Sequence, residues 1–407
     1  MQFSVHPNRS FFKLLSFRLF IVLAYQMIAV VVGWHIYELT HDTLALALGL
    51  IGLAEVLPYF SCALFAGYAV DHHSRRLFGV LASMMVFLSA LTLTLVAMGL
   101  INGNTLWWLY SAIAFNGIAR AFISPSYSSM FAIILPREKY AHASSIGSSV
   151  FQLALVVGPA LGGILVGLAG KTAGYGVASL LSLGAAGVLL SLRVKEPPPA
   201  ESSPIFTSIA SGLRFVFSNQ VILGAQSLDM FAVLFGGAVS MLPAFIHDVF
   251  HYGPEELGIL RAAPAAGAVI TGFFLARHPI NLHAGRWLLG AVAGFGLCII
   301  FFALSTNIWI AGTLLVLSGM CDGVSLVMRT TIMQLVTPDT MRGRVSAING
   351  IFIGSSNEVG AFESGMAARL IGLVPSVIFG GVMTLAVVAA TTKLAPKLRR
   401  LELHQLY

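Results

Sequence analysis

Apolar segments of about 20 residues or more alternate with short polar segments along the whole chain, which is the length a bilayer-crossing helix needs. We therefore predict one membrane-spanning helix for each apolar segment. The predicted helices cover residues 19–38, 44–69, 77–100, 106–132, 141–168, 173–192, 220–246, 256–276, 287–304, 308–335, 345–369 and 372–392. The pattern thus predicts an all-α polytopic membrane protein with twelve transmembrane helices.

The composition excludes a soluble fold, because 57% of the residues are hydrophobic and only 10% are charged, against about a quarter charged in soluble domains. The formal charge of +7 could indicate nucleic-acid binding. However, Lys and Arg occur in small groups between apolar segments, which favours anchors at one membrane face. We expect a lipid bilayer as partner and no nucleic acid. The three cysteines lie inside apolar segments and show no spacing typical of a metal site.

The distribution of positive charge predicts the orientation. Of the 23 Lys and Arg residues, eighteen lie in the N-terminal segment, in the loops after even-numbered helices or in the C-terminal segment. Among these, Arg9, Lys13 and Arg18 precede the first predicted helix, whereas the opposite loops hold only Lys171. Positive residues concentrate in cytoplasmic loops. Both termini are therefore predicted to be cytoplasmic, in a bacterial inner (plasma) membrane.

One long polar connection divides the predicted helices six and six. We predict an N-terminal bundle at residues 1–194, a cytoplasmic linker at 195–218 and a C-terminal bundle at 219–407. Apolar residues recur at helical spacing inside the linker, which favours a short amphipathic helix on the cytoplasmic surface over a disordered tether. These residues are Ile209, Leu213 and Val216.

The two halves match weakly when the chain is shifted by 202 residues. Gly117 then falls on Gly319, and Arg120 falls on Asp322. The matches join helices of the same number in each half, as parallel repeats do. We therefore expect two pseudo-symmetric six-helix bundles.

Two motifs carry a resemblance to a known family. Gly67, Asp71, Arg75 and Arg76 resemble the signature between helices 2 and 3 of the major facilitator superfamily, with His72 and Ser74 as departures. A second motif resembles the helix-5 sequence of antiporters and exporters in that family, and its residues are Gly158, Pro159, Gly162 and Gly163. The segments at 342–345 and 362–365 look most like the drug and siderophore efflux branch, which includes the enterobactin exporter. The resemblance implies the major facilitator fold and alternating access.

In the resembling family, the acidic residue after helix 2 docks against the start of helix 11 and helps to hold the outward-facing state. This resemblance implies a conformational latch in which Asp71 meets the region of Arg342 and Arg344. Gly67, Arg75 and Arg76 belong to the same predicted latch.

Ionisable residues inside membrane helices are costly and are functional candidates. Glu55, Asp229 and Asp322 are candidates for proton coupling. No Lys or Arg lies within a helical turn of Glu55 or Asp229, so we expect these carboxylates to be unpaired and to bind protons readily. Arg120 and Asp322 are a candidate ion pair that opens and closes during transport, with a permanent structural pair as the alternative.

Polar residues on the helices that line the cavity of the resembling family are candidates for substrate contacts. Each of them could instead be a satisfied contact between helices. The candidates are Tyr25, Gln26, Asn116, Arg120, Tyr127, Gln152, Asp322 and Arg329.

The sequence contains no strand-flanked phosphate loop and no nucleotide-binding domain. We therefore expect no enzyme activity and no cofactor, and a proton gradient as energy source. The predicted function is proton-coupled antiport that exports an amphipathic small molecule, such as a siderophore or a drug-like compound, from a functional monomer. An importer or symporter, a lysolipid translocator and a non-transporting membrane sensor or scaffold are the alternatives.

Overall fold

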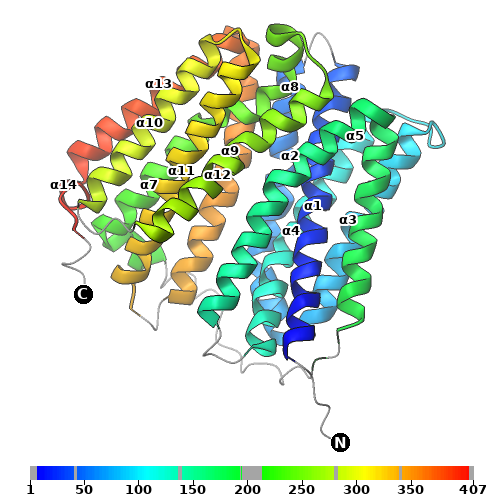
Figure 1. The fold of residues 1–407 in the computed structure, drawn as a ribbon, viewed down its shortest axis with the longest axis horizontal. Helices are drawn as coiled ribbons and strands as arrows, with labels where there is room; N and C mark the ends of the chain where they lie inside the picture. The colour runs from blue at the N-terminus through cyan, green and yellow to red at the C-terminus, as the bar shows by residue number, and fades with distance from the viewer. Residues whose placement is uncertain are drawn as a thin grey trace, which may run out of the picture. The chain divides into compact units, whose positions relative to one another are not determined.

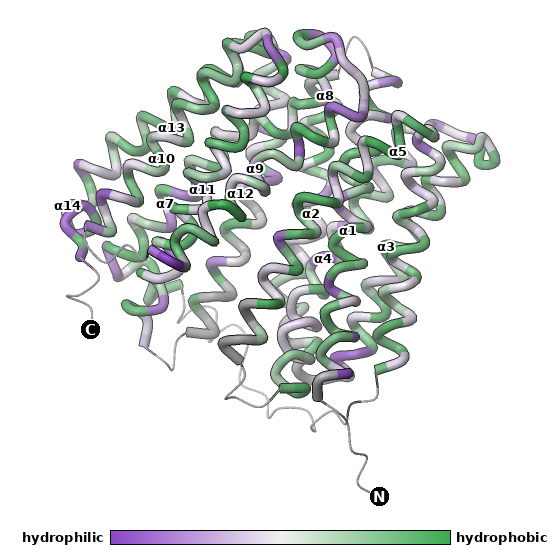
Figure 2. Tube along the Cα trace, viewed as in Figure 1, coloured by the Kyte–Doolittle hydropathy of each residue, from purple (hydrophilic) through white to green (hydrophobic). Residues whose placement is uncertain are grey.

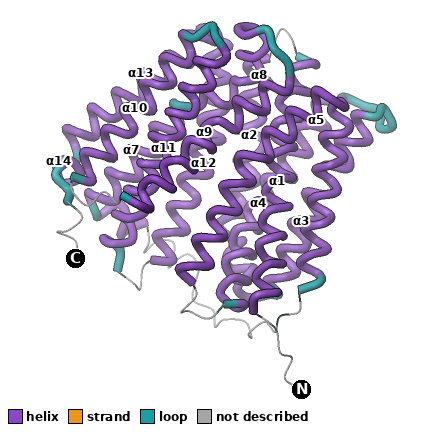
Figure 3. Tube along the Cα trace, viewed as in Figure 1, coloured by secondary structure: helices purple, strands orange, loops and turns teal. Residues whose placement is uncertain are grey.

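The structure, a computed structural model, describes residues 7–40, 44–135, 140–192, 194, 213–278, 283–338 and 342–402. Within these ranges the chain forms helices joined by turns and contains no strand (Figures 1 and 3). The helices are α1 Pro7–Leu39, α2 Leu44–His72, α3 Arg75–Ala97, α4 Thr105–Ile134, α5 Tyr140–Leu190, α7 Gln220–Phe235, η2 Gly237–Met241, α8 Leu242–Ala244, η3 Phe245–Phe250, α9 Pro254–Arg277, α10 Ala284–Leu304, α11 Ile308–Val336, α12 Arg342–Ile371, α13 Leu373–Leu394 and α14 Pro396–Arg399.

The predicted number of membrane crossings is confirmed. In the part of the chain that the structure describes, ten helical spans are long and apolar enough to cross a bilayer. One of them, Ile146–Leu190, has 45 residues, and Gly170 breaks it with φ 79° and ψ 170°, so it makes two crossings. The remaining crossing is α12, which is 30 residues long but carries more polar residues than the others. These helices give the predicted twelve-helix fold.

The first helix begins earlier than predicted, at Pro7 instead of residue 19. Phe11, Leu14 and Phe17 recur every third residue and are buried, which gives this segment an apolar face that packs on the bundle. As a result, Arg18 lies inside α1 and not in a polar segment before it.

The segment predicted as one helix at 220–246 is broken. After α7 ends at Phe235, the chain continues as a 3₁₀ turn, a short α segment and a π segment. Two glycines, Gly236 and Gly237, and Pro243 explain the break, because glycine weakens a helix and proline removes a backbone donor. A Cβ at Gly237 would lie 2.5 Å from Ser364 Oγ, so this glycine also permits the close approach of α12.

The chain divides into two compact units. Unit 1 contains Met1–His41, Ala54–Ser202 and Tyr252–Ala262, and unit 2 contains Asp42–Leu53, Ser203–His251 and Ala263–Tyr407. Helices α2 and α9 therefore each contribute to both units.

In unit 1, α5 packs against α1 and α3, and α3 packs against α4. Polar side chains join neighbouring helices inside this unit. Ser89 Oγ donates to Ala112 O at 3.0 Å, and His35 Nδ1 lies 3.1 Å from the Tyr175 hydroxyl. Each pair satisfies polar groups that lipid could not satisfy.

In unit 2, α10 runs beside α11 and α13 (Figure 1). The core of this unit combines α7, α10 and α11 with the residues that follow α13. Leu398 is completely buried, and a Cβ at Gly285 would lie 1.7 Å from Leu398 O. The segment around α14 is therefore an integral part of the unit.

The described end of the linker, residues 213–218, is helical. Val216 is buried and packs with Ile222, Met333, Val345 and Ile348 of unit 2. Residue 209 lies outside the described residues, so the amphipathic pattern can be followed only from Leu213 onward.

The internal repeat is visible in two matching helix crossings. A Cβ at Gly117 of α4 would lie 2.4 Å from the carbonyl oxygen of Glu55 in α2. A Cβ at Gly319 of α11 would lie 1.9 Å from the carbonyl oxygen of Pro264 in α9. Repeat-equivalent glycines thus let equivalent helices approach each other in both units.

Hydrophobic residues predominate along the helices (Figure 2), and many large ones are exposed. Leu88, Phe115, Leu180 and Phe301 are exposed, and Trp309 is 82% exposed. Water would disfavour so much exposed apolar surface, whereas lipid chains solvate it. The chain is therefore a multi-pass membrane protein.

Candidate functional site

An ion pair joins α2 and α4 inside unit 1. Glu55 Oε1 accepts a hydrogen bond from Arg120 Nη1. Gly117 lies one turn before Arg120, and its lack of a side chain lets α4 approach the backbone of Glu55. The pair neutralises two charges within the membrane-spanning part of the unit.

Aromatic rings surround both arginines of this region. The Arg120 guanidinium lies 5.4 Å from the ring centroid of Tyr25 and 5.9 Å from that of Tyr59. The Arg18 guanidinium lies 4.2 Å from the ring centroid of Tyr127 and 4.8 Å from that of Phe151. These distances are within the range of cation–π attraction. We call the group Arg18, Tyr25, Glu55, Tyr59, Arg120, Tyr127 and Phe151 the basic-aromatic cluster.

The other predicted cavity residues of unit 1 lie beside this cluster or are buried. Asn116 is buried, and its Oδ1 has no hydrogen-bond partner among the described residues. Gln26 packs against the helix-5 motif, because a Cβ at Gly158 would lie 2.8 Å from Gln26 Cβ. Gln152 directly follows Phe151 in α5 and is half-buried. The structure thus brings Tyr25, Arg120 and Tyr127 into one cluster, and Gln26, Asn116 and Gln152 lie on the same three helices, α1, α4 and α5.

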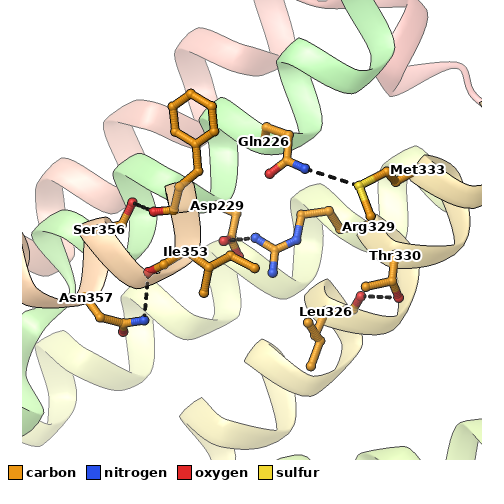
Figure 4. Close-up of polar contacts among 10 residues, drawn as sticks. Gln226, Asp229, Leu326, Arg329, Thr330, Met333, Ile353, Ser356 and Asn357 are labelled. Carbon is orange, nitrogen blue, oxygen red and sulfur yellow. Dashed lines mark hydrogen bonds and ion pairs between the residues drawn. The ribbon is translucent and has the colours of Figure 1, made fainter. Parts of the chain in front are cut away.

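A second ion pair lies in unit 2. Asp229 Oδ2 of α7 pairs with Arg329 Nη1 of α11, and Figure 4 shows the two side chains pointing toward each other. Their side chains are only 6% and 4% exposed, respectively. Nearby, Gln226 Nε2 donates to Met333 Sδ at 3.6 Å. On α12, the Ser356 hydroxyl and the Asn357 amide donate hydrogen bonds to backbone carbonyls of their own helix (Figure 4).

Asp322 has no hydrogen-bond or ion-pair partner among the described residues. Its carboxylate lines a small cavity together with Asp229, Ser325 and apolar residues of α7, α10 and α11. Ser325 is 2% exposed, and its hydroxyl has no hydrogen-bond partner in the described part of the chain. The lining of this cavity therefore includes the Asp322 carboxylate and a buried hydroxyl, each without a partner among the described residues.

The expectation that Glu55 and Asp229 are unpaired is wrong, because each pairs with an arginine. Both arginines come from another helix, so inspection of one helical turn along the same helix could not find them. The candidate ion pair between Arg120 and Asp322 stays a prediction, and Arg120 pairs with Glu55 in this structure. Of the three coupling candidates, Asp322 is the one without a countercharge in the described residues.

The predicted latch lies largely outside the described side chains. Gly67 and Asp71 are in the last turns of α2, and Arg342 and Arg344 begin α12, but the structure describes none of these four side chains. Arg75 begins α3. Arg76 Nη1 donates to Leu192 O at 2.8 Å, which ties the start of α3 to the end of α5. The latch therefore stays a prediction.

The helix-5 motif packs against two helices of unit 1. A Cβ at Gly162 would lie 3.2 Å from Met27 Cα in α1, and one at Gly163 would lie 2.6 Å from Gly258 Cα in α9. Pro159 lies inside α5, and its carbonyl oxygen would be 2.7 Å from a Cβ at Gly258. Small residues at this crossing allow nearly direct backbone contact.

Sequence inspection missed Arg18, because it was assigned to a segment before the first helix. A signal was present, however. Arg18 and Tyr25 are seven residues apart, and so are Arg120 and Tyr127. A spacing of seven residues places both members of a pair on one helix face. In the described residues, no group of three or more His, Cys, Asp or Glu side chains could hold a metal ion.

The comparisons with known proteins agree with this architecture. The model of the Major Facilitator Superfamily matches residues 14–361. The enterobactin exporter EntS of Shigella boydii serotype 4 (strain Sb227) is 25% identical over 331 residues, which are 80% of this chain and 77% of that protein.

Two solved structures share the fold at low sequence identity. A POT family transporter in complex with 5-aminolevulinic acid has a TM-score of 0.75, 12% identity and 96% coverage of each chain. A bacterial homolog of the human lysosomal transporter Spinster has a TM-score of 0.72, 16% identity and 97% coverage of each chain. The family model covers most of the chain, and the twelve-helix fold agrees with it. This protein therefore belongs to the Major Facilitator Superfamily.

Proposed function

We propose that the protein is a proton-coupled exporter of an amphipathic small molecule that works by alternating access. The observation that carries the proposal is the uncompensated carboxylate of Asp322 beside the unit 2 cavity. A charge without a partner in a membrane protein is costly, so such a residue is retained where a proton or an ion can neutralise it. Asp322 is the proposed proton-binding residue.

The neighbouring charges support this role. Asp229 and Arg329 neutralise each other, so the group of Asp229, Arg329 and Asp322 carries one excess negative charge when Asp322 is ionised. Protonation of Asp322 makes the group neutral. Binding of the proton therefore changes the net charge of this group from one negative charge to zero. Such a change in charge can bias a conformational equilibrium.

The buried hydroxyl of Ser325 is placed to assist Asp322. It lies three residues after Asp322 on the same helix face and also lines the cavity. A hydroxyl can donate to an ionised carboxylate or accept from a protonated one. Ser325 can therefore form a hydrogen bond with Asp322 in either protonation state of the carboxyl group.

Three observations favour export of an amphipathic molecule. The curated relatives are named as enterobactin exporters, at 25% identity. The helix-5 glycine motif, which resembles the motif of exporters, packs closely against α1 and α9. Aromatic side chains predominate around the two arginines of unit 1, which suits a siderophore or a drug-like compound with an apolar scaffold.

We place the protein as a monomer in the inner membrane, with both termini in the cytoplasm.

The test is efflux from vesicles that contain the purified protein and an imposed pH gradient, with a panel of siderophores, fluorescent drugs and lysolipids. For the panel member that the wild type transports, we expect Asp322→Asn to lose gradient-driven accumulation but to keep exchange of labelled for unlabelled substrate. Asp248→Asn, at an exposed carboxylate, is the control and should retain both activities.

Three results would overturn the proposal. Full gradient-driven transport by Asp322→Asn would show that another group carries the proton. Transport that depends on a sodium gradient and is independent of pH would show that sodium, and not the proton, is the coupling ion. Binding of panel members without any flux would favour a sensor or scaffold.

A further inference from the structure

The basic-aromatic cluster has a reciprocal arrangement. Arg18 and Tyr25 lie on one face of α1, and Arg120 and Tyr127 lie on one face of α4. The arginine of each helix contacts the tyrosine of the other, with Arg18 over Tyr127 and Arg120 over Tyr25. The same two residue types are therefore used twice between the same two helices.

The two arginines differ in their countercharge. Arg120 pairs with Glu55, whereas Arg18 has no acidic partner among the described residues. Among the described residues, the rings of Tyr127 on α4 and Phe151 on α5 and the backbone near Gly147 on α5 lie beside Arg18. The cluster of two arginines and one glutamate thus carries one excess positive charge, located at Arg18.

The surroundings of Arg18 also contain an unused hydrogen-bonding group. The Tyr127 hydroxyl is buried and has no hydrogen-bond partner within the described residues. A Cβ at Gly147 would lie 2.5 Å from this hydroxyl and 3.4 Å from Arg18 Nη1. Glycine at position 147 therefore lets the Tyr127 hydroxyl and the Arg18 guanidinium pack close to the backbone of α5.

A purely structural role does not account for this combination. Aromatic rings attract a guanidinium but leave its charge uncompensated and its N–H groups available, whereas a carboxylate would use them. Buried hydroxyls usually find a hydrogen-bond partner. An anion bound beside Arg18 would satisfy the guanidinium and the Tyr127 hydroxyl together.

We propose that Arg18, Tyr127 and Phe151 form a subsite for an anionic group attached to a flat apolar scaffold, such as an aromatic carboxylate. The guanidinium provides a forked pair of donors that matches a carboxylate. The Tyr127 hydroxyl adds a third donor, and the Phe151 ring packs against the scaffold. The inference rests on the proposed transport function and names the substrate class. The phosphate of an anionic lipid has the same charge chemistry, and the test separates these two sources.

The experiment measures binding of 1-naphthoate and of its neutral analogue 1-naphthamide to the purified protein in phosphatidylcholine nanodiscs, by titration calorimetry. We expect naphthoate to bind about tenfold or more tightly than naphthamide, because a charge-assisted hydrogen bond is worth at least that factor. Arg18→Gln should abolish this preference, and Arg18→Lys should restore part of it. Tyr127→Phe should lower naphthoate affinity several-fold and leave naphthamide binding unchanged.

Arg9→Gln is the matched control, because Arg9 is an exposed arginine at the start of the same helix. It should bind both probes as the wild type does. Gly147→Ala is an independent variant that places a methyl group against the Tyr127 hydroxyl and displaces it while Arg18 is kept, and it should also weaken naphthoate binding. Size-exclusion profiles and melting temperatures confirm that each variant is folded.

Equal affinity of the wild type for both probes, or an unchanged preference in Arg18→Gln, would overturn the subsite. Loss of the preference for naphthoate when the wild type is measured in nanodiscs that contain phosphatidylglycerol would assign Arg18 to a lipid headgroup and overturn the substrate assignment. Binding needs no gradient, so these outcomes are independent of coupling at Asp322. A failed subsite can therefore be distinguished from a failed transport function.

Discussion

Asp229 of α7 and Arg329 of α11 form an ion pair whose side chains are almost completely buried within unit 2. A buried pair is sensitive to the loss of one member, because the remaining charge has no compensation. This relationship leads to the first prediction, which concerns stability.

We expect Asp229→Asn and Arg329→Gln to destabilise the protein by about 3–5 kcal/mol each, and the double variant to be more stable than either single variant. The measurement is thermal unfolding in detergent for a complete double-mutant cycle. If the effects of the two single substitutions simply add, the pair has no coupling energy and the prediction is wrong.

The repeat-equivalent glycines Gly117 and Gly319 are the basis of a second prediction. Alanine at either position places a Cβ against a backbone carbonyl of the neighbouring helix. We expect each alanine variant to lose about 1–3 kcal/mol of stability through overpacking. Gly187→Ala and Gly290→Ala are matched controls, because no atom lies within 4 Å of a Cβ at these positions. Equal melting temperatures for all four variants would contradict the close crossings.

Competition between proton and substrate is the third prediction. If Asp322 exchanges a proton for substrate, addition of the exported panel member to unbuffered purified protein should release protons. Lowering the pH should weaken substrate binding in the wild type, because protonated Asp322 then predominates. Asp322→Asn should release no protons and bind substrate independently of pH. Substrate binding by the wild type without proton release would contradict exchange at this residue.

The predicted latch gives a fourth test. Asp71→Asn should reduce the transport rate while leaving substrate affinity largely intact, because the latch biases the conformational states and does not contact substrate. Flux in vesicles and equilibrium binding measure the two effects separately. Loss of binding in a variant that is still folded would place Asp71 in the substrate site.

Segment length and the positions of charged loops were sufficient to predict the fold, because a bilayer fixes how long an apolar helix must be. The break in α7 depends on Gly236, Gly237 and Pro243 together with a close approach by α12, and helix contacts of this kind are absent from a hydropathy pattern. The split of one long helix at Gly170 was placed correctly, because a polar turn interrupts the apolar segment there.

Partners of charged residues were harder to predict than the helices themselves. Glu55 and Arg120 are 65 residues apart, and only the packing of α2 on α4 brings them together. Arg18 was assigned to a polar segment by its charge, although Phe11, Leu14 and Phe17 extend the helix before it. The apolar spacing of these three residues is the sequence signal for the earlier start of the helix.

Residues 395–401 complete the core of unit 2, where Leu398 is fully buried and packs with α7 and α10. During synthesis, α7 and α10 enter the membrane long before these residues leave the ribosome. Unit 2 therefore cannot close its core while translation of α13 is still in progress, and it reaches its final packing only after that helix has been inserted.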